Sequence, residues 1–278
     1  MRIAIQGQEA SYHDIARNKY FADQEQEVLH CDTFKDVFDA VDNNTADFGL
    51  VAIENSLYGS INDVYDLLLK YKFWISGEIY LRINHCLLGT SEAKIADIKE
   101  VHSQLPALAQ CEDFLDTHLS HAERVEEHDT SASAAMVAKA NNKHIAAIAS
   151  AAAAKLYGLQ ILASDIESNK QNYTRFIIFG KKQKLVESAN KTSLIVHTDN
   201  DTQAGALYRT LGVFAKRGIS LTKIESRPII GKAWHYLFYM DFEVGAESSE
   251  GKDALKELAE IGAQATILGS YKKGRKIE

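Results

Sequence analysis

Cysteine and basic runs are scarce in this sequence, and both shortages exclude classes of function. The three cysteines, Cys31, Cys86 and Cys111, are scattered over 278 residues. They form neither a disulfide framework nor a Cys-x-x-Cys metal site, so we expect reduced thiols. The formal net charge is −7, with no lysine- or arginine-rich block. A nucleic-acid partner is therefore excluded, because nothing supplies clustered phosphate contacts.

Membrane and metal signals are also missing. Residues 1–7 read as a short strand followed by a glycine, which is neither a signal peptide nor a spanning helix. We therefore expect a cytoplasmic protein with no membrane partner. His118, His121 and His128 form the only suggestive histidine group, but acidic and hydroxyl residues surround them, as in a solvated connector. We expect no metal site there.

The common cofactor motifs are absent as well. A dinucleotide enzyme needs G-x-G-x-x-G after its first strand, and this chain has Gly7 followed by Gln8, Glu9 and Ala10. Neither Gly-x-Ser-x-Gly nor a P-loop occurs. Proton transfer or simple binding remains, and we expect no cofactor.

What is present is an alternation of strands and helices, with 46% hydrophobic residues to build a core. Short apolar runs end in polar residues that begin helices, which predicts an α/β fold with ligands bound beyond the carboxyl ends of the strands. The predicted strands cover residues 3–6, 48–53, 101–103, 125–128 and 145–149, and the predicted helices cover residues 13–20, 61–67, 106–115, 134–140 and 151–158.

A second domain is predicted after a polar linker at residues 181–191. From residue 192 the order is β-α-β-β-α-β, which is that of a ferredoxin-like domain. The predicted elements are residues 193–197, 203–217, 219–226, 234–244, 251–261 and 265–268. We expect domains at residues 1–184 and 192–271.

Hydroxyl and amide side chains gather at the predicted helix starts of the first domain. Taken singly, each is an ordinary helix cap. Taken together, and with few acidic neighbours, they predict a neutral pocket of hydrogen-bond donors for a small anion such as a carboxylate. These residues are Ser11, Asn55, Ser56, Ser103, Gln110, Thr130 and Ser131. Thr174 and Arg175 add a hydroxyl and a guanidinium at the mouth of a further apolar strand.

Several segments resemble the prephenate dehydratases that carry a C-terminal regulatory ACT domain, in the family's order and spacing. In the first domain they are GQEASYHDIA, IENSLYGSINDVYDLL, HCLLG, VHSQLPALAQC, DTSASAA, LYGLQIL and NYTRF, and in the second GALYRTLGVFAKRGISLTKIESRP. The resemblance implies a two-lobed α/β catalytic domain similar to type II periplasmic binding proteins, followed by a ferredoxin-like ACT domain. It also implies conversion of prephenate to phenylpyruvate, on the route to phenylalanine, without a cofactor.

The resemblance assigns roles residue by residue. Thr174 matches the threonine that delivers a proton to the leaving hydroxyl, as a positioned donor because a free threonine is a very weak acid. Arg175 could face a substrate carboxylate or hold the cleft through an acidic neighbour. Cys111 is assigned to packing. The expected substrate-binding residues are Ser11, Asn55, Ser56, Ser103, Gln110, Thr130, Ser131 and Phe176.

The second domain is expected to bind L-phenylalanine as an allosteric inhibitor. Its expected effector-binding residues are Gly205, Ala206, Leu207, Glu225, Ser226, Arg227 and Pro228. Such domains pair, so we expect a homodimer or homotetramer formed through them. Tyr208 departs from the family pattern, and so do Gln8 and Ala10 in the first loop. Because alanine does not readily adopt a positive φ, we expect the backbone of that loop to differ from the backbone of the family's first loop.

Two other functions stay open. The first is the same chemistry on arogenate, which has an amino group in place of the keto group. The second is a sensor that binds an amino acid or carboxylate without turnover. The chain's ends show neither a mutase segment nor a further domain, so a monofunctional enzyme is expected.

Overall fold

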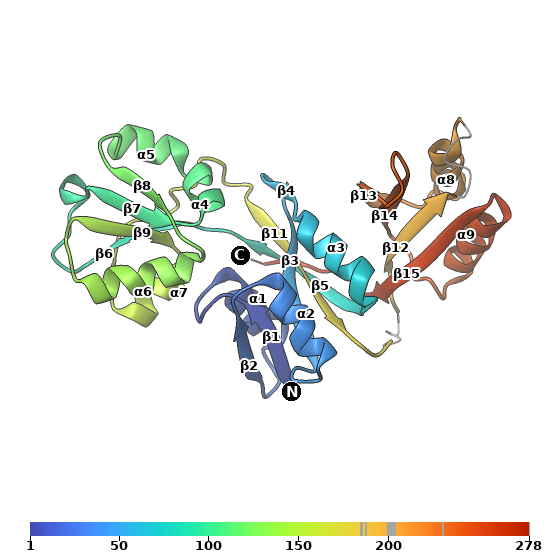
Figure 1. Cartoon of the computed structure of the whole chain (residues 1–278), viewed down its shortest axis with the longest axis horizontal. Helices are drawn as coiled ribbons and strands as arrows, with labels where there is room; N and C mark the ends of the chain where they lie inside the picture. Colours follow the sequence, from blue (N-terminus) through green and yellow to red (C-terminus); the bar gives the residue numbers. More distant parts are fainter. Residues whose placement is uncertain (184–185, 187, 199–203, 230, 278) are drawn as a thin grey trace. The chain divides into compact units, whose positions relative to one another are not determined.

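The computed structural model describes residues 1–183, 186, 188–198, 204–229 and 231–277. In these ranges no helix is long and apolar enough to cross a membrane. The chain divides into two compact units (Figure 1). The first unit consists of Met1–Leu67, Ile79–Phe176 and Lys276–Glu278, and the second consists of Leu68–Glu78 and Ile177–Arg275.

A seven-stranded sheet begins in the first unit. Its order is β16-β5-β11-β3-β1-β2, with β4 paired to β3, and β1 runs parallel to both β2 and β3. The strands β5 and β11 contribute residues to both units. The strands are β1 (Arg2–Gln6), β2 (Glu27–Cys31), β3 (Phe48–Asn55), β4 (Gly59–Ser60), β5 (Trp74–Arg82), β11 (Tyr173–Gly180) and β16 (Lys276–Ile277), and the helices between them are α1 (Tyr12–Tyr20), α2 (Phe34–Asp42) and α3 (Asn62–Tyr71).

A five-stranded sheet of order β10-β6-β9-β7-β8 completes the first unit. Its apolar layer is built around Ile148 and Val101, both fully buried, together with residues of the flanking helices. The strands are β6 (Cys86–Gly89), β7 (Glu100–Ser103), β8 (Glu123–Glu126), β9 (Ile145–Ala149) and β10 (Gln160–Ala163), and the helices are the 3-10 turn η1 (Ile95–Asp97), α4 (Leu105–Gln110), α5 (Glu112–His118), α6 (Thr130–Ala140) and α7 (Ala151–Tyr157).

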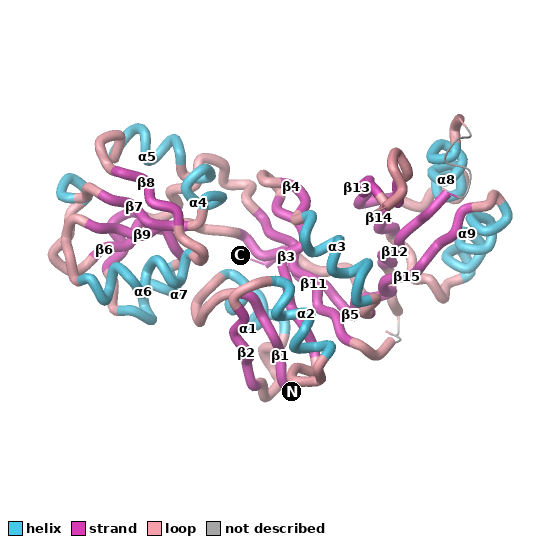
Figure 2. The backbone as a smooth tube through the Cα atoms, viewed as in Figure 1, coloured by secondary structure: helices cyan, strands magenta, loops and turns pink. Residues whose placement is uncertain are grey.

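The second unit contains the predicted β-α-β-β-α-β domain. Its antiparallel sheet has the order β13-β14-β12-β15, and Figure 2 shows both helices on one side of it. Phe214 of the first helix and Leu258 of the second are fully buried against Leu194 and Met240 of the sheet. The elements are β12 (Lys191–Thr198), α8 (Ala206–Ala215), β13 (Leu221–Pro228), β14 (Tyr236–Phe242), α9 (Ser249–Glu260) and β15 (Ala263–Tyr271). Residues 203 and 230 lie outside the described part of the chain.

The helix caps differ from the prediction at four of the hydroxyl positions. Ser11 does cap α1, accepting from the backbone N–H of Asp14. Gln104, not Ser103, is the cap residue of α4, and Asp129 rather than Thr130 or Ser131 caps α6. Ser56 follows the end of β3 and leads into the short strand β4, not into a helix. An aspartate is as good a cap as serine or threonine, so the sequence Asp129-Thr130-Ser131 offered three equivalent starts.

The first loop also corrects the sequence expectation. Ala10 has a φ of 62°, so the alanine does adopt the left-handed conformation that we expected it to avoid. Two hydrogen bonds hold it there: its N–H donates to Asp14 Oδ2 over 3.0 Å, and its carbonyl accepts from Ser150 Oγ over 2.8 Å. These bonds offset a conformational cost of about 1–2 kcal/mol.

A buried ion pair lies where β12 begins in the second unit. The Nζ of Lys191 is 2.8 and 3.0 Å from the two carboxylate oxygens of Glu78 on β5, and the two side chains are 1% and 0% exposed. Asp241 Oδ2 is 3.6 Å from the same ammonium group. The Glu78 carboxylate also accepts from the backbone N–H of Gly274 over 3.0 Å.

Candidate active site

A cavity of about 400 Å³ lies within the first unit, lined by strands of the seven-stranded sheet and by the helices α4 and α6 beside the five-stranded sheet. Its volume is in the range that proteins use for small-molecule ligands. One wall is polar, with Asn55, Gln110 and Thr174, and another carries the apolar side chains of Phe34 and Phe176. Among the described residues that line this cavity there is no lysine or arginine. Its hydrogen-bond donors are therefore neutral, although the carboxyl groups of Asp63 and Asp129 also line it.

Thr174 is the first residue of a row of hydrogen-bonded side chains on the polar wall. Asn55 Nδ2 donates to Thr174 Oγ1 over 3.0 Å and to Asn172 Oδ1 over 2.7 Å. Asn172 Nδ2 donates to Gln110 Oε1 over 2.8 Å, and His85 Nε2 lies 2.9 Å from the same oxygen. Residues from four separate parts of the sequence thus meet in this amide row.

The backbone fixes the direction of every bond in the amide row. The N–H groups of Leu57 and Tyr58 both donate to Asn55 Oδ1 over 2.9 Å, so this atom must be the oxygen and the other the NH₂ group. Asn172 therefore accepts from Asn55 and donates to Gln110, whose oxygen in turn accepts from His85 Nε2–H.

This direction leaves the Thr174 hydroxyl hydrogen free. A hydroxyl has one hydrogen and two lone pairs, and Thr174 uses a lone pair for Asn55. No described residue accepts from it, and Thr174 lines the cavity. The site therefore presents an O–H donor to whatever occupies the cavity, with its oxygen polarised by the amide of Asn55.

His85 and Tyr12 extend the amide row on its far side. With its Nε2 donating to Gln110, the neutral imidazole of His85 has Nδ1 as an acceptor, 3.1 Å from the Tyr12 hydroxyl. Burial lowers the pKa of His85, which favours this neutral form. The carbonyl of Asn84 lies 2.6 Å from the same hydroxyl, so the single hydrogen of Tyr12 is shared between these two acceptors. Burial raises the pKa of Tyr12, so it remains a phenol.

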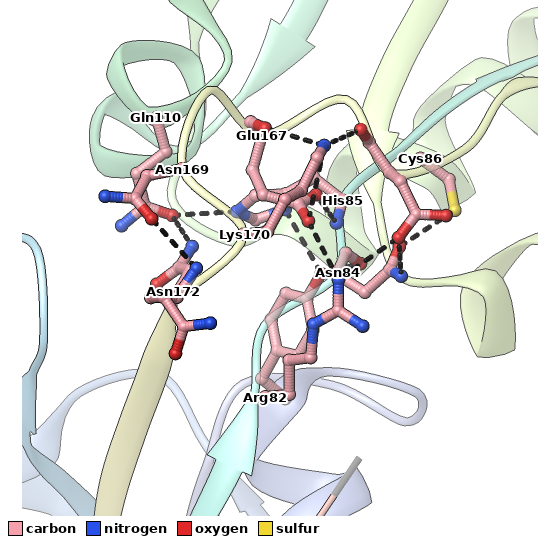
Figure 3. A network of polar contacts seen from close by, with 12 residues as sticks. Arg82, Asn84, His85, Cys86, Gln110, Glu167, Asn169, Lys170 and Asn172 are labelled. Carbon is pink, nitrogen blue, oxygen red and sulfur yellow. Dashed lines mark hydrogen bonds and ion pairs between the residues drawn. The ribbon is translucent and has the colours of Figure 1, made fainter.

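Behind His85 lies a charged cluster centred on Glu167 (Figure 3). Glu167 Oε2 accepts from the backbone N–H of His85 over 3.0 Å, while Arg82 and Lys170 lie 3.6 and 3.8 Å from Oε1. Because the carboxylate is fully buried, two cations and a backbone donor are needed to compensate it. The cluster fixes the backbone of His85, and with it the ring that orients Gln110.

The cavity brings together six of the ten predicted catalytic and substrate-binding residues, and all six belong to the first unit. Ser11, at the start of α1, and Thr130, at the start of α6, face it together with the residues of β3, α4 and β11. The six are Ser11, Asn55, Gln110, Thr130, Thr174 and Phe176.

The other four lie close in sequence to the cavity but do not line it. Ser103 is fully buried and donates to the carbonyl of Ile148 over 2.7 Å. Ser131 Oγ donates to the carbonyl of Glu9, and Ser56 Oγ donates to that of Gln171. These three hydroxyls hold the backbone around the site. The fourth residue, Arg175, is considered next.

Arg175 is buried and lies between Thr174 and Phe176 on β11. Successive side chains of a strand point to opposite faces, and both neighbours of Arg175 line the cavity. Arg175 therefore lies on the other face of the sheet. This placement favours the second of its two predicted roles, that of holding the structure rather than contacting a substrate carboxylate.

The effector-binding residues predicted in the second unit lie at the ends of two elements. Gly205 caps α8 with a φ of 84°, a conformation that glycine adopts without strain, and Ala206 and Leu207 are the first two residues of that helix. Glu225, Ser226, Arg227 and Pro228 end β13, an edge strand of its sheet. Tyr208 is 80% exposed.

Cys111 is fully buried in the apolar cluster of the five-stranded sheet, as its assignment to packing requires. It does not line the cavity.

The sequence reasoning did not predict several polar residues of the cavity and of the amide row, among them Tyr12, His13, His85, Asp129 and Asn172. All five residues lie inside the segments that carry the resemblance. Asp129 accepts from the backbone N–H groups of Gln8 over 2.9 Å and Ser131 over 2.8 Å, and burial raises its pKa. Position in or next to a motif was the available signal for these five.

Comparisons with known proteins identify the family of the chain. The sequence model of the family described as prephenate dehydratase matches residues 3–184, and that of the ACT domain matches residues 192–260. The bifunctional chorismate mutase/prephenate dehydratase of Escherichia coli K12 is 38% identical over 97% of this chain and 70% of its own length. Arogenate dehydratase 2 of Petunia hybrida is 38% identical over 98% of this chain and 71% of its own length.

Solved structures share this fold. A prephenate dehydratase from Arthrobacter aurescens in complex with L-Phe has a TM-score of 0.88 and 31% identity, covering 98% of this chain and 90% of that one. A protein described as GqqA, a novel type of quorum quenching acylase, has a TM-score of 0.86 and 34% identity, with 98% of both chains covered.

The chain therefore belongs to the prephenate dehydratase family and carries an ACT domain. It is an enzyme of the carbon–oxygen lyase class. The predicted resemblance and the predicted fold class, a two-lobed α/β domain with a ferredoxin-like domain, are both confirmed.

Proposed function

We propose that the chain converts prephenate to phenylpyruvate, with Thr174 as the donor to the leaving hydroxyl. The observation that carries this proposal is the free Thr174 hydroxyl hydrogen, left for the cavity because the amide of Asn55 occupies a lone pair of the same oxygen. The family and the relatives named prephenate dehydratase support the substrate.

The chemistry asks little of the protein beyond position. The bond from the ring to its carboxylate breaks, carbon dioxide leaves, and the electron pair passes into the ring. The bond to the ring hydroxyl breaks at the opposite carbon, and the departing oxygen leaves as water once it has accepted a proton. The ring becomes aromatic, which drives the reaction. A positioned O–H donor accelerates such a step by about 10²–10⁴-fold.

The amide row keeps that donor in position. Thr174 is a poor acid, and the Asn55 amide that donates to its oxygen also stabilises negative charge as the hydrogen moves away. Because Asn172, Gln110 and His85 orient Asn55, these residues are positioning residues for the same step. Water then restores the proton on Thr174.

A spectrophotometric assay tests the proposal. Purified protein should release phenylpyruvate from prephenate, and Thr174→Val, which removes the hydroxyl at nearly constant volume, should lower kcat by about 10²–10⁴-fold. Thr174→Ser keeps the hydroxyl and should retain most of the activity. Absence of phenylpyruvate with the wild-type protein contradicts the function, and full turnover by Thr174→Val contradicts the role of the hydroxyl.

Regulation by L-phenylalanine is proposed for the second domain. The Arthrobacter aurescens structure with L-Phe supports this, and so does the start of α8, where Gly205 has no side chain to oppose the close approach of a ligand. Phenylalanine inhibits if it binds a less active arrangement more tightly than the active one. Ser226→Ala and Gly205→Ala should weaken inhibition while uninhibited turnover persists. Unchanged inhibition in both variants contradicts the assignment.

A second copy of the chain is proposed to complete the effector site. The cavity described beside Ala206 and Arg209 measures about 10 Å³, which is room for about one water molecule rather than an amino acid. Large apolar side chains are also exposed on this unit, among them Tyr208, Ile224 and Tyr236. We propose a homodimer or homotetramer through this domain. Sedimentation at several concentrations, with and without phenylalanine, measures the state directly.

The domain boundaries are proposed at residues 1–184 and 192–271, close to the segments matched by the two family models. Limited proteolysis between residues 181 and 191 should cut the chain into two fragments with little further cleavage.

Arogenate is the second candidate substrate. The relatives named arogenate dehydratase, at 38% identity, support it as directly as those named prephenate dehydratase. The two substrates differ at the side chain, where arogenate has an ammonium group and prephenate a keto group. Comparison of kcat/KM for both substrates decides between them.

Acylase activity is a third candidate, supported by the structure named as a quorum quenching acylase. The apolar wall of the cavity, with Phe34 and Phe176, suits an acyl chain. Hydrolysis of an N-acyl homoserine lactone, followed by detection of the released amine, tests it. Loss of that activity in Thr174→Val would place both reactions in one cavity.

A further inference from the structure

His13 occupies the apolar wall of the cavity, where it is the second residue of α1. Its ring meets that of Phe176 edge to face at a centroid distance of 5.0 Å, and that of Phe34 at 5.8 Å and a tilt of 55°. The two phenylalanines fix the plane of the imidazole. A histidine in this position brings polar ring nitrogens to a wall that its two phenylalanine neighbours make apolar.

The backbone fixes which nitrogen of His13 carries the hydrogen. The N–H of Ala52 on β3 donates to His13 Nε2 over 3.1 Å, so this nitrogen keeps its lone pair and the hydrogen is on Nδ1. Burial lowers the pKa of His13 to about 3, so the ring is neutral at ordinary pH. No described residue hydrogen-bonds to Nδ1. His13 therefore presents one N–H donor with no competing acceptor.

The strand β11 sets the position of the His13 donor relative to the Thr174 hydroxyl. Thr174 and Phe176 are two residues apart on one face of the strand, which separates them by about 7 Å. His13 packs on Phe176, so its donor lies farther along the wall than the Thr174 hydroxyl. In the proposed substrate, the three-carbon side chain is attached at the ring carbon opposite the leaving hydroxyl. A substrate with its hydroxyl at Thr174 and its ring along Phe176 would bring that side chain to His13.

We propose that His13 is a specificity-determining residue, whose Nδ1–H donates to the keto oxygen of the substrate side chain and so favours the keto acid over the amino acid. A keto oxygen accepts a hydrogen bond, whereas the ammonium group of arogenate can only donate, and two donors cannot pair. The inference rests on the proposed dehydratase function. It adds to that function a preference for prephenate over arogenate.

The fixed tautomer matters to this preference. A histidine free to exchange tautomers could turn an acceptor nitrogen toward an ammonium group and accommodate both substrates. Ala52 prevents this, because its N–H already occupies the acceptor nitrogen. Protonation of His13 would leave two donors facing each other at Ala52, so the ring does not become a cation that pairs with a carboxylate.

The test compares kcat/KM for prephenate and arogenate in four proteins. Wild type should prefer prephenate. His13→Phe keeps a ring on Phe176 but has no donor, and should lower the preference by about 10- to 100-fold, chiefly through loss on prephenate. His13→Gln can still accept from Ala52 through its amide oxygen, which leaves its NH₂ group as a donor for the cavity. Its preference should therefore stay within about threefold of wild type, and a ratio as low as that expected for His13→Phe would contradict the role of the donor even if the phenylalanine variant does not fold.

Phe34→Leu is the matched control. It changes the same wall, next to the His13 ring, without altering a hydrogen-bonding atom. Its kcat/KM should change by the same factor for both substrates, leaving their ratio constant within about twofold. A change of the ratio in Phe34→Leu equal to that in His13→Phe would show that wall shape, not the donor, sets the preference, and would overturn the proposal.

The possible results distinguish failure of the His13 proposal from failure of the proposed dehydratase function. If wild type turns over both substrates and the ratio is unchanged in His13→Phe, or is lost in His13→Gln, the inference is wrong and the dehydratase function stands. A wild-type preference for arogenate also overturns the inference while the dehydratase chemistry remains. If wild type turns over neither substrate, the proposed function fails, and the inference fails with it.

Discussion

The amide nitrogen of Asn55 lies 3.0 Å from the hydroxyl oxygen of Thr174, and its amide oxygen accepts two backbone N–H groups at 2.9 Å. The two backbone hydrogen bonds identify the oxygen of the Asn55 amide, and so they establish that its nitrogen donates to Thr174. A hydroxyl that accepts from an amide must point its own hydrogen elsewhere, and the cavity is where Thr174 faces. A loop turn thus determines the orientation of the proposed proton donor.

Exchange of Asn55 for aspartate should reverse the direction of the hydrogen bond between this side chain and the Thr174 hydroxyl. In Asn55→Asp the introduced carboxylate would still accept from Leu57 and Tyr58, so the turn persists, but its second oxygen would accept the Thr174 hydrogen where the amide had donated. We expect Asn55→Asp to lower kcat for prephenate by about 10²–10⁴-fold. Stopped assays over a range of substrate concentrations separate kcat from KM.

Asn62→Asp is the control for the added charge, because Asn62 also lines the cavity and has no hydrogen bond to Thr174 among the described contacts. It should raise KM for an anionic substrate while kcat stays within about threefold of wild type. An equal loss of kcat in both variants would mean that charge alone explains the effect, and would contradict the role of hydroxyl direction.

These relationships show which parts of the site were predictable from the sequence. The α/β alternation and the ferredoxin-like order were visible because each element carries its own local pattern of apolar residues. Thr174 was one hydroxyl among several until the resemblance marked it. The amide row from Asn55 to His85 includes the contact of Asn55 with Asn172, 117 positions away, and no local pattern encodes such a contact.

The sequence analysis was wrong about the backbone of Ala10 and did not predict β16, and in both cases contacts between distant parts of the chain determine the structure. Ala10 holds its positive φ through Ser150, which is 140 residues away, so its own preference was overruled by tertiary hydrogen bonds. β16 consists of two residues, Lys276 and Ile277, and exists because β5 offers it an edge. A strand that short has no periodicity to detect.

The three cysteines should be unreactive in the folded protein. All are buried, and desolvation raises the pKa of Cys31 and of Cys86 to about 11 and that of Cys111 still higher. Because the thiolate is the reactive form, labelling with Ellman's reagent at pH about 8 should be at least about 100-fold slower in the native protein than in urea. A thiol that reacts at once in native buffer would contradict this burial.

The buried pair of Lys191 and Glu78 should be costly to break from one side. Lys191→Met leaves a carboxylate uncompensated and should lower the free energy of unfolding by about 3–5 kcal/mol. Adding Glu78→Gln, which keeps an acceptor for Gly274, should recover much of that loss. Urea denaturation measures both variants.

Lys35→Met provides the surface comparison, since Lys35 pairs with Asp39 on an exposed helix face. Its effect should not exceed about 1 kcal/mol. If the double variant is no more stable than Lys191→Met alone, the two side chains are not energetically coupled and the prediction is wrong.

The stability of the protein should depend on pH through His13. Its pKa is lowered from 6.5 to about 3 in the folded state, so below pH 6.5 the unfolded chain binds a proton that the folded protein does not. The contribution of His13 to stability is therefore complete above this pH and is lost as the pH falls toward 3.

His13→Gln isolates this contribution, because glutamine cannot take up that proton. The difference in unfolding free energy between wild type and His13→Gln should shift against wild type by about 3 kcal/mol between pH about 7 and pH about 4. Buried His85 and Asp129 titrate equally in both proteins and cancel in the difference. Phe34→Leu, compared with wild type in the same way, should give a difference that does not vary with pH. A constant difference for His13→Gln as well would show that His13 is protonated equally in the folded and unfolded states, which would remove the neutral, fixed tautomer on which its proposed selectivity depends.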